Sequence, residues 1–185
     1  MFIDDTPAST MLAGPARDAL TSAIRALDTA ESQGRPGAMS EALAQVARCY
    51  RGVGLLDAAD TYLQQALRFA RPMGAVDSLV GLLSDMAELS LARAGEQGSD
   101  TQSMRAEQDR ARDYCFEAAT LARQTADPSW EVQVLLRVSG VLDTLGDHGD
   151  AIALQCRALD LIARDHLHEP LSLPVAAARG SRALM

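Results

Sequence analysis

Residues 43–67, LAQVARCYRGVGLLDAADTYLQQAL, decide how this chain folds, because the pattern returns as residues 135–159, LLRVSGVLDTLGDHGDAIALQCRAL. At a constant offset of 92 positions, Leu43 matches Leu135 and Gly54 matches Gly146. On both sides of the glycine, apolar residues recur every three or four positions, which predicts two amphipathic helices joined by a tight turn. The chain therefore contains at least two copies of one helix pair.

The remaining sequence fits the same unit. A middle copy starts its first helix at Leu79, 36 positions after Leu43, and its second helix reaches Ala111, 52 positions after Ala59. The difference of 16 residues predicts an insertion between these two helices, near 95–110. Residues 16–33 match residues 56–73, the second helix of the first pair, at an offset of 40 positions. They therefore form a second helix that has no matching first helix before it.

Periodicity and punctuation by Gly and Pro predict an all-α chain of about seven helices. Asp100 and Asp127 are expected as helix N-caps, the latter followed by Pro128 at the first helical position. Short turns leave a bundle or a stacked solenoid, and the internal repeat favours the solenoid. The helices are expected at about 16–33, 40–53, 57–71, 75–94, 100–125, 128–145 and 149–164. We expect a flexible arm at 1–15, one repeat domain over 16–166, and a flexible or loosely docked tail at 167–185.

The repeat resembles the tetratricopeptide repeat (TPR), a helix–turn–helix unit of about 34 residues. It departs from that family at Ser90, where the turn glycine belongs, and at Gln155, where a large apolar residue is usual. The resemblance implies a short right-handed superhelix whose concave groove is lined by the first helix of each pair. The matching residues of the first unit are Leu43, Val46, Ala47, Tyr50, Gly54, Ala59, Leu63, Ala66, Leu67 and Pro72; those of the last are Leu135, Val138, Ser139, Leu142, Gly146, Ala151, Ala158 and Leu159.

Position by position, the resemblance implies a binding groove for a protein or peptide. Chaperone-binding members hold a peptide carboxylate with Lys and Asn, and this chain contains neither residue type. Instead, Arg48 and Arg51 either hold a carboxylate or phosphate bidentately or form a solvated arginine-rich face. The alternative is a regulatory domain that senses a small anionic ligand. The implied groove residues are Glu41, Ala44, Arg48, Arg51, Asp77, Val80, Ser84, Glu88, Gln133, Leu136 and Asp143.

Composition excludes several functional classes. The net charge of −8 argues against nucleic acid as the main partner. No stretch approaches the ~18 apolar residues of a membrane span, and the acidic N-terminus does not resemble a signal peptide. Three widely spaced cysteines are expected as small buried hydrophobes in a reducing cytoplasm. All 17 basic residues are Arg, which is typical of a GC-rich genome.

The sequence contains no convincing catalytic or metal site. The tetrad Asp147-His148-Gly149-Asp150 follows the turn glycine Gly146, so we interpret it as a bend in which Asp147 caps the next helix. His166 and His168 are two apart and would point in different directions on a helix. Without Lys there is no Walker A motif and no Schiff-base nucleophile. We therefore predict a non-enzyme with no cofactor.

The last helix lacks a following helix to cover it. Its apolar residues Ile152, Leu154, Leu159 and Leu161 would leave one side open to solvent. Either the tail, through Leu171, Leu173 and Val175, or a second subunit would cover them. Of the two, we favour self-association into a homodimer through the last helix or tail.

Overall fold

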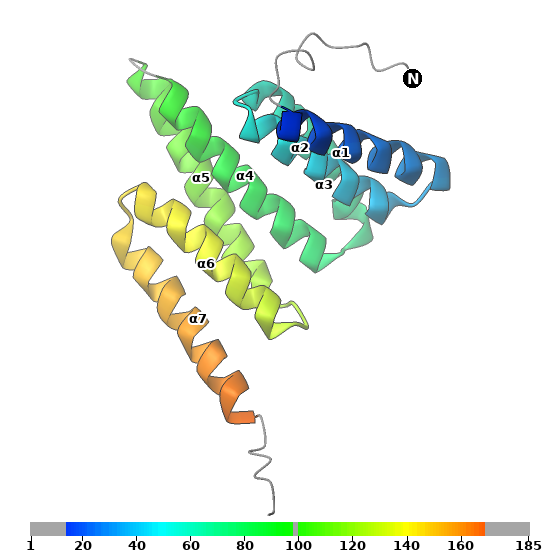
Figure 1. The fold of residues 1–185 in the computed structure, drawn as a ribbon. Helices are drawn as coiled ribbons and strands as arrows, with labels where there is room; N and C mark the ends of the chain where they lie inside the picture. The colour runs from blue at the N-terminus through cyan, green and yellow to red at the C-terminus, as the bar shows by residue number, and fades with distance from the viewer. Residues whose placement is uncertain (1–13, 98–99, 169–185) are drawn as a thin grey trace, which may run out of the picture.

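The computed structural model describes residues 14–97 and 100–168 of the chain. These residues form seven α-helices and no strand, which confirms the predicted all-α class. The helices form a stack of antiparallel pairs (Figure 1). Residues 1–13 and 169–185, and hence nearly all of the expected arm and tail, lie outside the described residues. The helices are α1 (Gly14–Gln33), α2 (Pro36–Gly52), α3 (Leu56–Met73), α4 (Val76–Glu96), α5 (Thr101–Ala122), α6 (Pro128–Thr144) and α7 (His148–His168).

The turns within the first and last pairs are equivalent in structure as well as in sequence. Gly54 has a φ of 78° and Gly146 a φ of 86°, in the left-handed region that glycine occupies at little cost. After each glycine the chain folds back on the helix before it: Leu55 N–H donates to the Tyr50 carbonyl at 3.0 Å, and Asp147 N–H donates to the Leu142 carbonyl at 2.9 Å. The offset of 92 residues therefore relates two copies of the same helix-ending hydrogen bond.

The insertion in the middle unit lengthens its helices. Helix α4 runs without a turn through Ser90, where the glycine of the other units would end it, and continues to Glu96. Only residues 97–100 connect it to α5. The expected insertion near 95–110 is therefore mostly helical, because a pair of antiparallel helices can extend together and keep packing.

The caps expected at Asp100 and Asp127 are confirmed. The Asp100 carboxylate accepts the backbone N–H groups of Gln102 and Ser103, at 3.1 and 3.3 Å. The Ser103 hydroxyl, and then those backbone groups, lower the pKa of Asp100 below its ordinary value. Asp127 likewise accepts the N–H of Ser129 at 2.9 Å. Each cap satisfies N–H groups that the first helical turn leaves without a partner.

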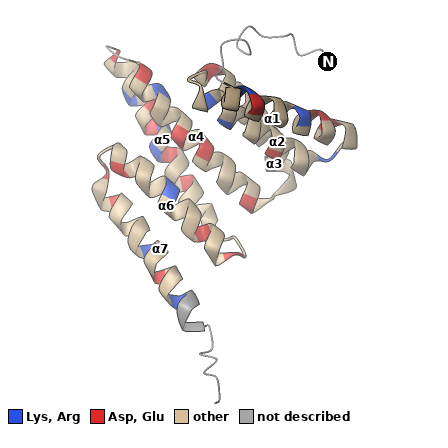
Figure 2. Ribbon diagram, in the orientation of Figure 1, with Lys and Arg blue, Asp and Glu red and all other residues tan. Residues whose placement is uncertain are grey.

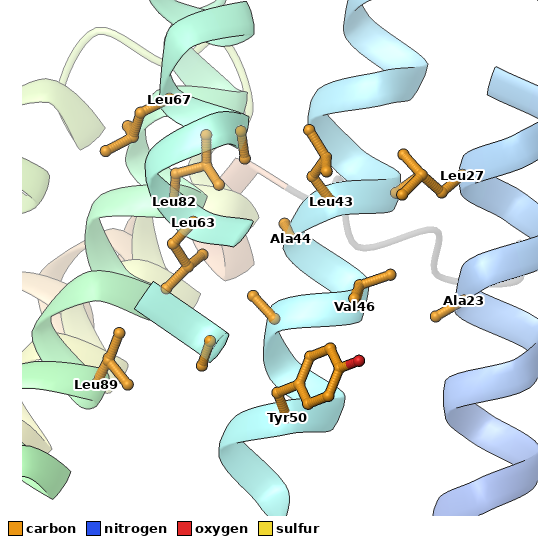
Figure 3. Packing of buried hydrophobic residues seen from close by; sticks show 14 of the residues in the cluster. Ala23, Leu27, Leu43, Ala44, Val46, Tyr50, Leu63, Leu67, Leu82 and Leu89 are labelled. Atoms are coloured by element: carbon orange, nitrogen blue, oxygen red, sulfur yellow. The ribbon is translucent and has the colours of Figure 1, made fainter. Parts of the chain in front are cut away.

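Alanine brings the helices close together, and leucine fills the spaces between. Ala59, Ala66, Ala118 and Ala158 are fully buried where paired helices meet. Leu43 and Val46 of α2 face Leu27 and Ala23 of α1, whereas Leu63 and Leu82 lie on the other side of α2 (Figure 3). A core of small and branched aliphatic residues explains how a chain with only 4% aromatic residues remains closely packed.

Helix α4 is the centre of the stack. Its Leu82, Met86 and Leu89 pack in the core shared with α1–α3, and its Val80 and Leu83 pack in the core shared with α5–α7. Because one helix contributes to both cores, the stack is expected to unfold as one cooperative unit.

The first helices of the pairs form one side of the stack. Helix α4 contacts both α2 and α6, whereas α3 and α5 make at most marginal contact with each other. The stack therefore curves towards α2, α4 and α6, and we call the surface formed by these three helices the inner face. The Trp130 ring of α6 packs over Gly81 of α4, 3.5 Å from the position a Cβ would occupy, which is an ordinary van der Waals distance.

Candidate functional site

The inner face contains a network of five charged side chains from three helices. Helix α2 contributes Arg48 and Arg51, α4 contributes Asp85 and Glu88, and α6 contributes Arg137. Arg48 Nε donates to Asp85 Oδ2 at 2.9 Å, and Arg51 donates to Glu88. Arg137 bridges both acids, at 2.8 Å from Asp85 Oδ1 and 2.9 Å from Glu88 Oε1. Three repeat units are thus joined by guanidinium–carboxylate contacts.

Asp85 is the centre of this network. Its side chain is 1% exposed, and each of its two oxygens accepts a hydrogen bond from a different arginine. Burial by itself would lower the pKa of Arg137, but its hydrogen bond with Asp85 and the charges of Asp85 and Glu88 raise that pKa above its ordinary value. A buried carboxylate without such partners would be strongly unfavourable, so the network is part of the fold.

Two members of the network, Asp85 and Arg137, are missing from the groove residues that the sequence implied. A signal for Asp85 exists in the sequence: the run VGLLSDMAELSLA of α4 is mostly apolar, and its charged residues are Asp85 and Glu88. Asp85 and Glu88 are three apart, as are Arg48 and Arg51. Residues three apart share one helix face, so the two acids of α4 can pair with the two arginines of the neighbouring first helix, α2.

The expectation that Arg48 and Arg51 await an external anion needs correction. Both already bind carboxylates of α4, because α2 and α4 pack directly against each other. The network of three arginines and two acids still has a net charge of +1. The Arg48 side chain remains 42% exposed and also donates to Gln45 Oε1 at 2.9 Å. Arg48 thus has the most exposed side chain of the three arginines, compared with 33% for Arg137 and 25% for Arg51.

The other implied groove residues divide by burial. Ala44, Val80 and Ser84 are at most 3% exposed, so their expected role in an open groove is wrong. They are buried because neighbouring first helices touch, which leaves only the outermost positions of each helix accessible. The exposed positions are Glu41, Asp77, Gln133, Leu136 and Asp143, and Glu88 is half-buried. Both signs of charge occur along the helices (Figure 2).

A hollow of about 560 Å³ adjoins the network between α1 and α2. Its size is within the range of small-molecule and peptide side-chain sites. Arg25, Glu41 and Arg48 supply charges at its walls. Its other lining residues are alanines and uncharged polar residues: Ala26, Thr29, Ala30, Gln33, Ala38, Ala42 and Gln45.

The repeat explains why this hollow exists. Helix α1 corresponds to the second helix of a pair, and the described residues contain no first helix before it. The position of Ala26 corresponds to Ala66 of α3, which is 0% exposed and whose carbonyl accepts the Ser40 hydroxyl of α2 at 3.1 Å. Ala26 itself is exposed. The hollow lies where a preceding first helix would otherwise pack.

The acidic tetrad forms structural contacts. Asp147 accepts a hydrogen bond from Arg112 Nε of α5 at 2.6 Å, a contact that the sequence did not predict. The Asp147 carboxylate accepts no hydrogen bond from a backbone N–H of α7, so the expected side-chain cap is not formed. His148 Nδ1 lies 2.7 Å from Asp143 Oδ1. Among the described residues, no group of three or more His, Cys, Asp or Glu side chains is arranged to hold a metal ion.

The cysteines are not all buried as expected. Cys115 is fully buried, and burial, with smaller effects from Glu88 and Asp147, raises its pKa to about 12. Cys49 is half-buried, and Cys156 is exposed. Cys156 differs because it lies one repeat position further along its helix than Cys115: the counterparts of Cys156, Gln64 in α3 and Phe116 in α5, are exposed as well.

Comparison with known proteins shows the fold alone. No family model matches the chain, and no curated protein matches it. The crystal structure of BtubC (BKLC) from P. vanneervenii superposes over 93% of this chain with a TM-score of 0.64 and 18% identity. This chain spans 64% of the length of that one. A structure described as the DHF58 filament matches with a TM-score of 0.47 and 23% identity, over 82% of this chain and 81% of the other. No described helix is long and apolar enough to cross a membrane. The chain is therefore similar in fold to the BtubC structure.

Proposed function

We propose that this chain is a TPR-like scaffold that binds a peptide segment of a partner protein in the hollow between α1 and α2. The observation that carries the proposal is the hollow itself, which opens where the repeat would place another helix. A surface shaped for a helix suits a helical peptide segment, because an amphipathic helix presents its side chains at the same spacing whichever chain it belongs to.

The lining of the hollow indicates the chemistry of the segment. The alanines at its base accommodate small apolar side chains. Arg25 is exposed and forms no ion pair with any described residue, and Arg48 is partly exposed. Arg48 already binds Asp85, so Arg25 is the arginine of the hollow that favours a segment carrying a carboxylate.

The second candidate is a sensor of a small anion, and the same hollow favours it for a different reason. A volume of about 560 Å³ holds a small organic acid without any protein partner. Such an anion would bind Arg25 and Arg48 by itself, whereas a peptide would also need the apolar base of the hollow.

The test starts from random short peptides displayed on phage and selected against the full chain. We expect enriched sequences to combine an acidic residue with small apolar residues. The affinity of one enriched peptide is then measured by titration calorimetry for the wild type, Arg25→Glu and the control Arg68→Glu. Arg68 is an exposed arginine of α3 outside the hollow. Arg25→Glu should weaken binding by about 10- to 100-fold, the value of a charge-assisted hydrogen bond of about 1.5–3 kcal/mol.

The outcomes separate the candidates. The peptide proposal would be overturned if Arg25→Glu and Arg68→Glu lost the same affinity for the peptide, or if the selection enriched no sequence. Binding of free acetate or phosphate that Arg25→Glu abolishes, without any peptide enrichment, would support the anion sensor. Arg48→Glu is unsuitable as a probe because it would place a third acid beside Asp85 and Glu88 and disrupt the fold.

A further inference from the structure

A second cleft, of about 390 Å³, lies between the second helices α3 and α5. Its floor is formed by α4, and its walls by α3 and α5, which make at most marginal contact with each other. It shares no lining residue with the hollow between α1 and α2. We call it the α3–α5 cleft.

The insertion in the middle unit builds one end of this cleft. Ser90 lies where the other units have their turn glycine, and α4 continues past it to Arg93 of the floor. On the α5 wall, Glu107 and Arg110 belong to the inserted stretch. The last unit turns at Gly146, the counterpart of Ser90, so this end of the cleft has no counterpart there.

Three polar groups of the cleft have no hydrogen-bond partner among the described residues. Ser90 is 5% exposed, and its hydroxyl is the first of these groups. The second is the hydroxyl of the half-buried Tyr114, which stays protonated because burial, and next the charge of Asp60, raises its pKa. The third is the buried Oε2 of Glu107, whose Oε1 accepts from Arg110 at 3.0 Å. Because buried polar groups are normally paired, this convergence indicates a site for a ligand.

The charges on the walls and floor balance. Asp60 and Glu107 supply two negative charges, and Arg93 and Arg110 supply two positive ones. Arg93 lies between the two acids, at 3.4 Å from Asp60 and 4.0 Å from Glu107. Asp57, which also binds Arg93, is 94% exposed and is not part of the lining. The cleft therefore favours neither a cation nor an anion.

We propose that the α3–α5 cleft binds an uncharged, polyhydroxylated small molecule, a monosaccharide or a cyclic polyol. A hydroxyl group both donates and accepts, so several on one ring match two protein hydroxyls and an unpaired carboxylate oxygen. Met86 and Leu89, 2% and 1% exposed, give the floor an apolar surface against which the C–H groups of the ring pack. The volume is at the lower end for ligand pockets, which suits a single ring.

Binding is expected to move one side chain of the wall. The Arg110 side chain is 60% exposed, and its ion pair with Glu107 is therefore weak. We expect Arg110 to turn aside and admit a ligand hydroxyl to the Glu107 carboxylate, since side-chain changes of this kind are common on binding.

The first test follows the backbone amide signals of the isotope-labelled full chain by NMR while single probes are added. The uncharged probes are D-glucose, D-ribose and myo-inositol, and the charged ones are putrescine and acetate. At least one uncharged probe should shift the signals around Ser90 and Tyr114, with a dissociation constant on the order of 1 mM, typical of a few hydrogen bonds. Putrescine and acetate should leave those signals unchanged. Shifts confined to α1 and α2 would concern the hollow instead.

The second test measures the affinity of the bound polyol for variants that lose one hydroxyl. Ser90→Ala and Tyr114→Phe should each weaken binding by about 3- to 10-fold, the value of a typical hydrogen bond. Ser78→Ala is the matched control, because Ser78 is an exposed serine of α4 outside the cleft, and it should bind as the wild type does. Circular dichroism confirms that all three variants remain helical.

Three results would overturn the proposal. The first is that no polyol shifts the signals around Ser90 and Tyr114, and the second is that putrescine or acetate shifts them as strongly. The third is that Ser90→Ala and Tyr114→Phe bind the polyol as tightly as Ser78→Ala does. None of these results bears on peptide binding in the hollow, which Arg25→Glu tests separately.

Discussion

Replacement of Asp85 by alanine should test how the repeat units are held together. The substitution removes the carboxylate that accepts hydrogen bonds from Arg48 and Arg137. Breaking a buried ion pair usually costs about 3–5 kcal/mol because the remaining charge stays buried. Here the Arg48 and Arg137 side chains are 42% and 33% exposed, so water can solvate both. We therefore expect a loss of about 2–3 kcal/mol in the free energy of unfolding.

The measurement is urea unfolding followed by circular dichroism, with a thermal melt for comparison. For a chain of this size, a loss of about 2–3 kcal/mol lowers the Tm by roughly 4–12 °C. Asp77→Ala is the control, because Asp77 is an exposed acid on the same helix. It should change the free energy of unfolding by less than about 0.5 kcal/mol.

A double substitution separates the ion pair from the loss of packing. Arg137→Met removes the guanidinium and keeps an unbranched side chain. If the pair is coupled, Asp85→Ala combined with Arg137→Met should cost about 1–2 kcal/mol less than the sum of the single changes. Additive effects, or an Asp85→Ala variant as stable as Asp77→Ala, would refute a network that holds α2, α4 and α6 together.

Three further predictions follow from the turns, the cysteines and the caps. Gly146→Ala should lower the free energy of unfolding by about 1–2 kcal/mol, because alanine is strained in the left-handed backbone conformation. Gly140→Ala, at an open helical position, should raise that free energy by up to about 1 kcal/mol in the same urea assay. If Gly146→Ala were the more stable of the two variants, the assigned turn would be contradicted. At pH 8, iodoacetamide should label native Cys156 but not Cys115, whose pKa is raised to about 12, as peptide mass spectrometry would show. The pKa of Asp100 is lowered, so its contribution to stability should be full above the carboxyl's unfolded-state pKa and be lost as the pH falls through its lower folded-state pKa. An NMR titration with an ordinary pKa for this carboxyl would be inconsistent with the cap.

Residues that act within a helix or its adjoining turn were predictable. The apolar periodicity identified the seven helices, and the glycines at 54 and 146 identified the turns. Asp100 and Asp127 were identified as caps because an N-cap bonds to backbone only two or three residues away. The errors concerned contacts between neighbouring units: Ala44, Val80 and Ser84 were expected in an open groove and are buried.

The sequence by itself determined the helices, their caps, their turns and the repeat that stacks them, because all of these depend on residues near one another in the chain. Only the tertiary structure decided which side chains remain accessible. Arg48 and Asp85 meet across 37 positions, and Asp85 and Arg137 across 52, so their pairing requires the packed first helices.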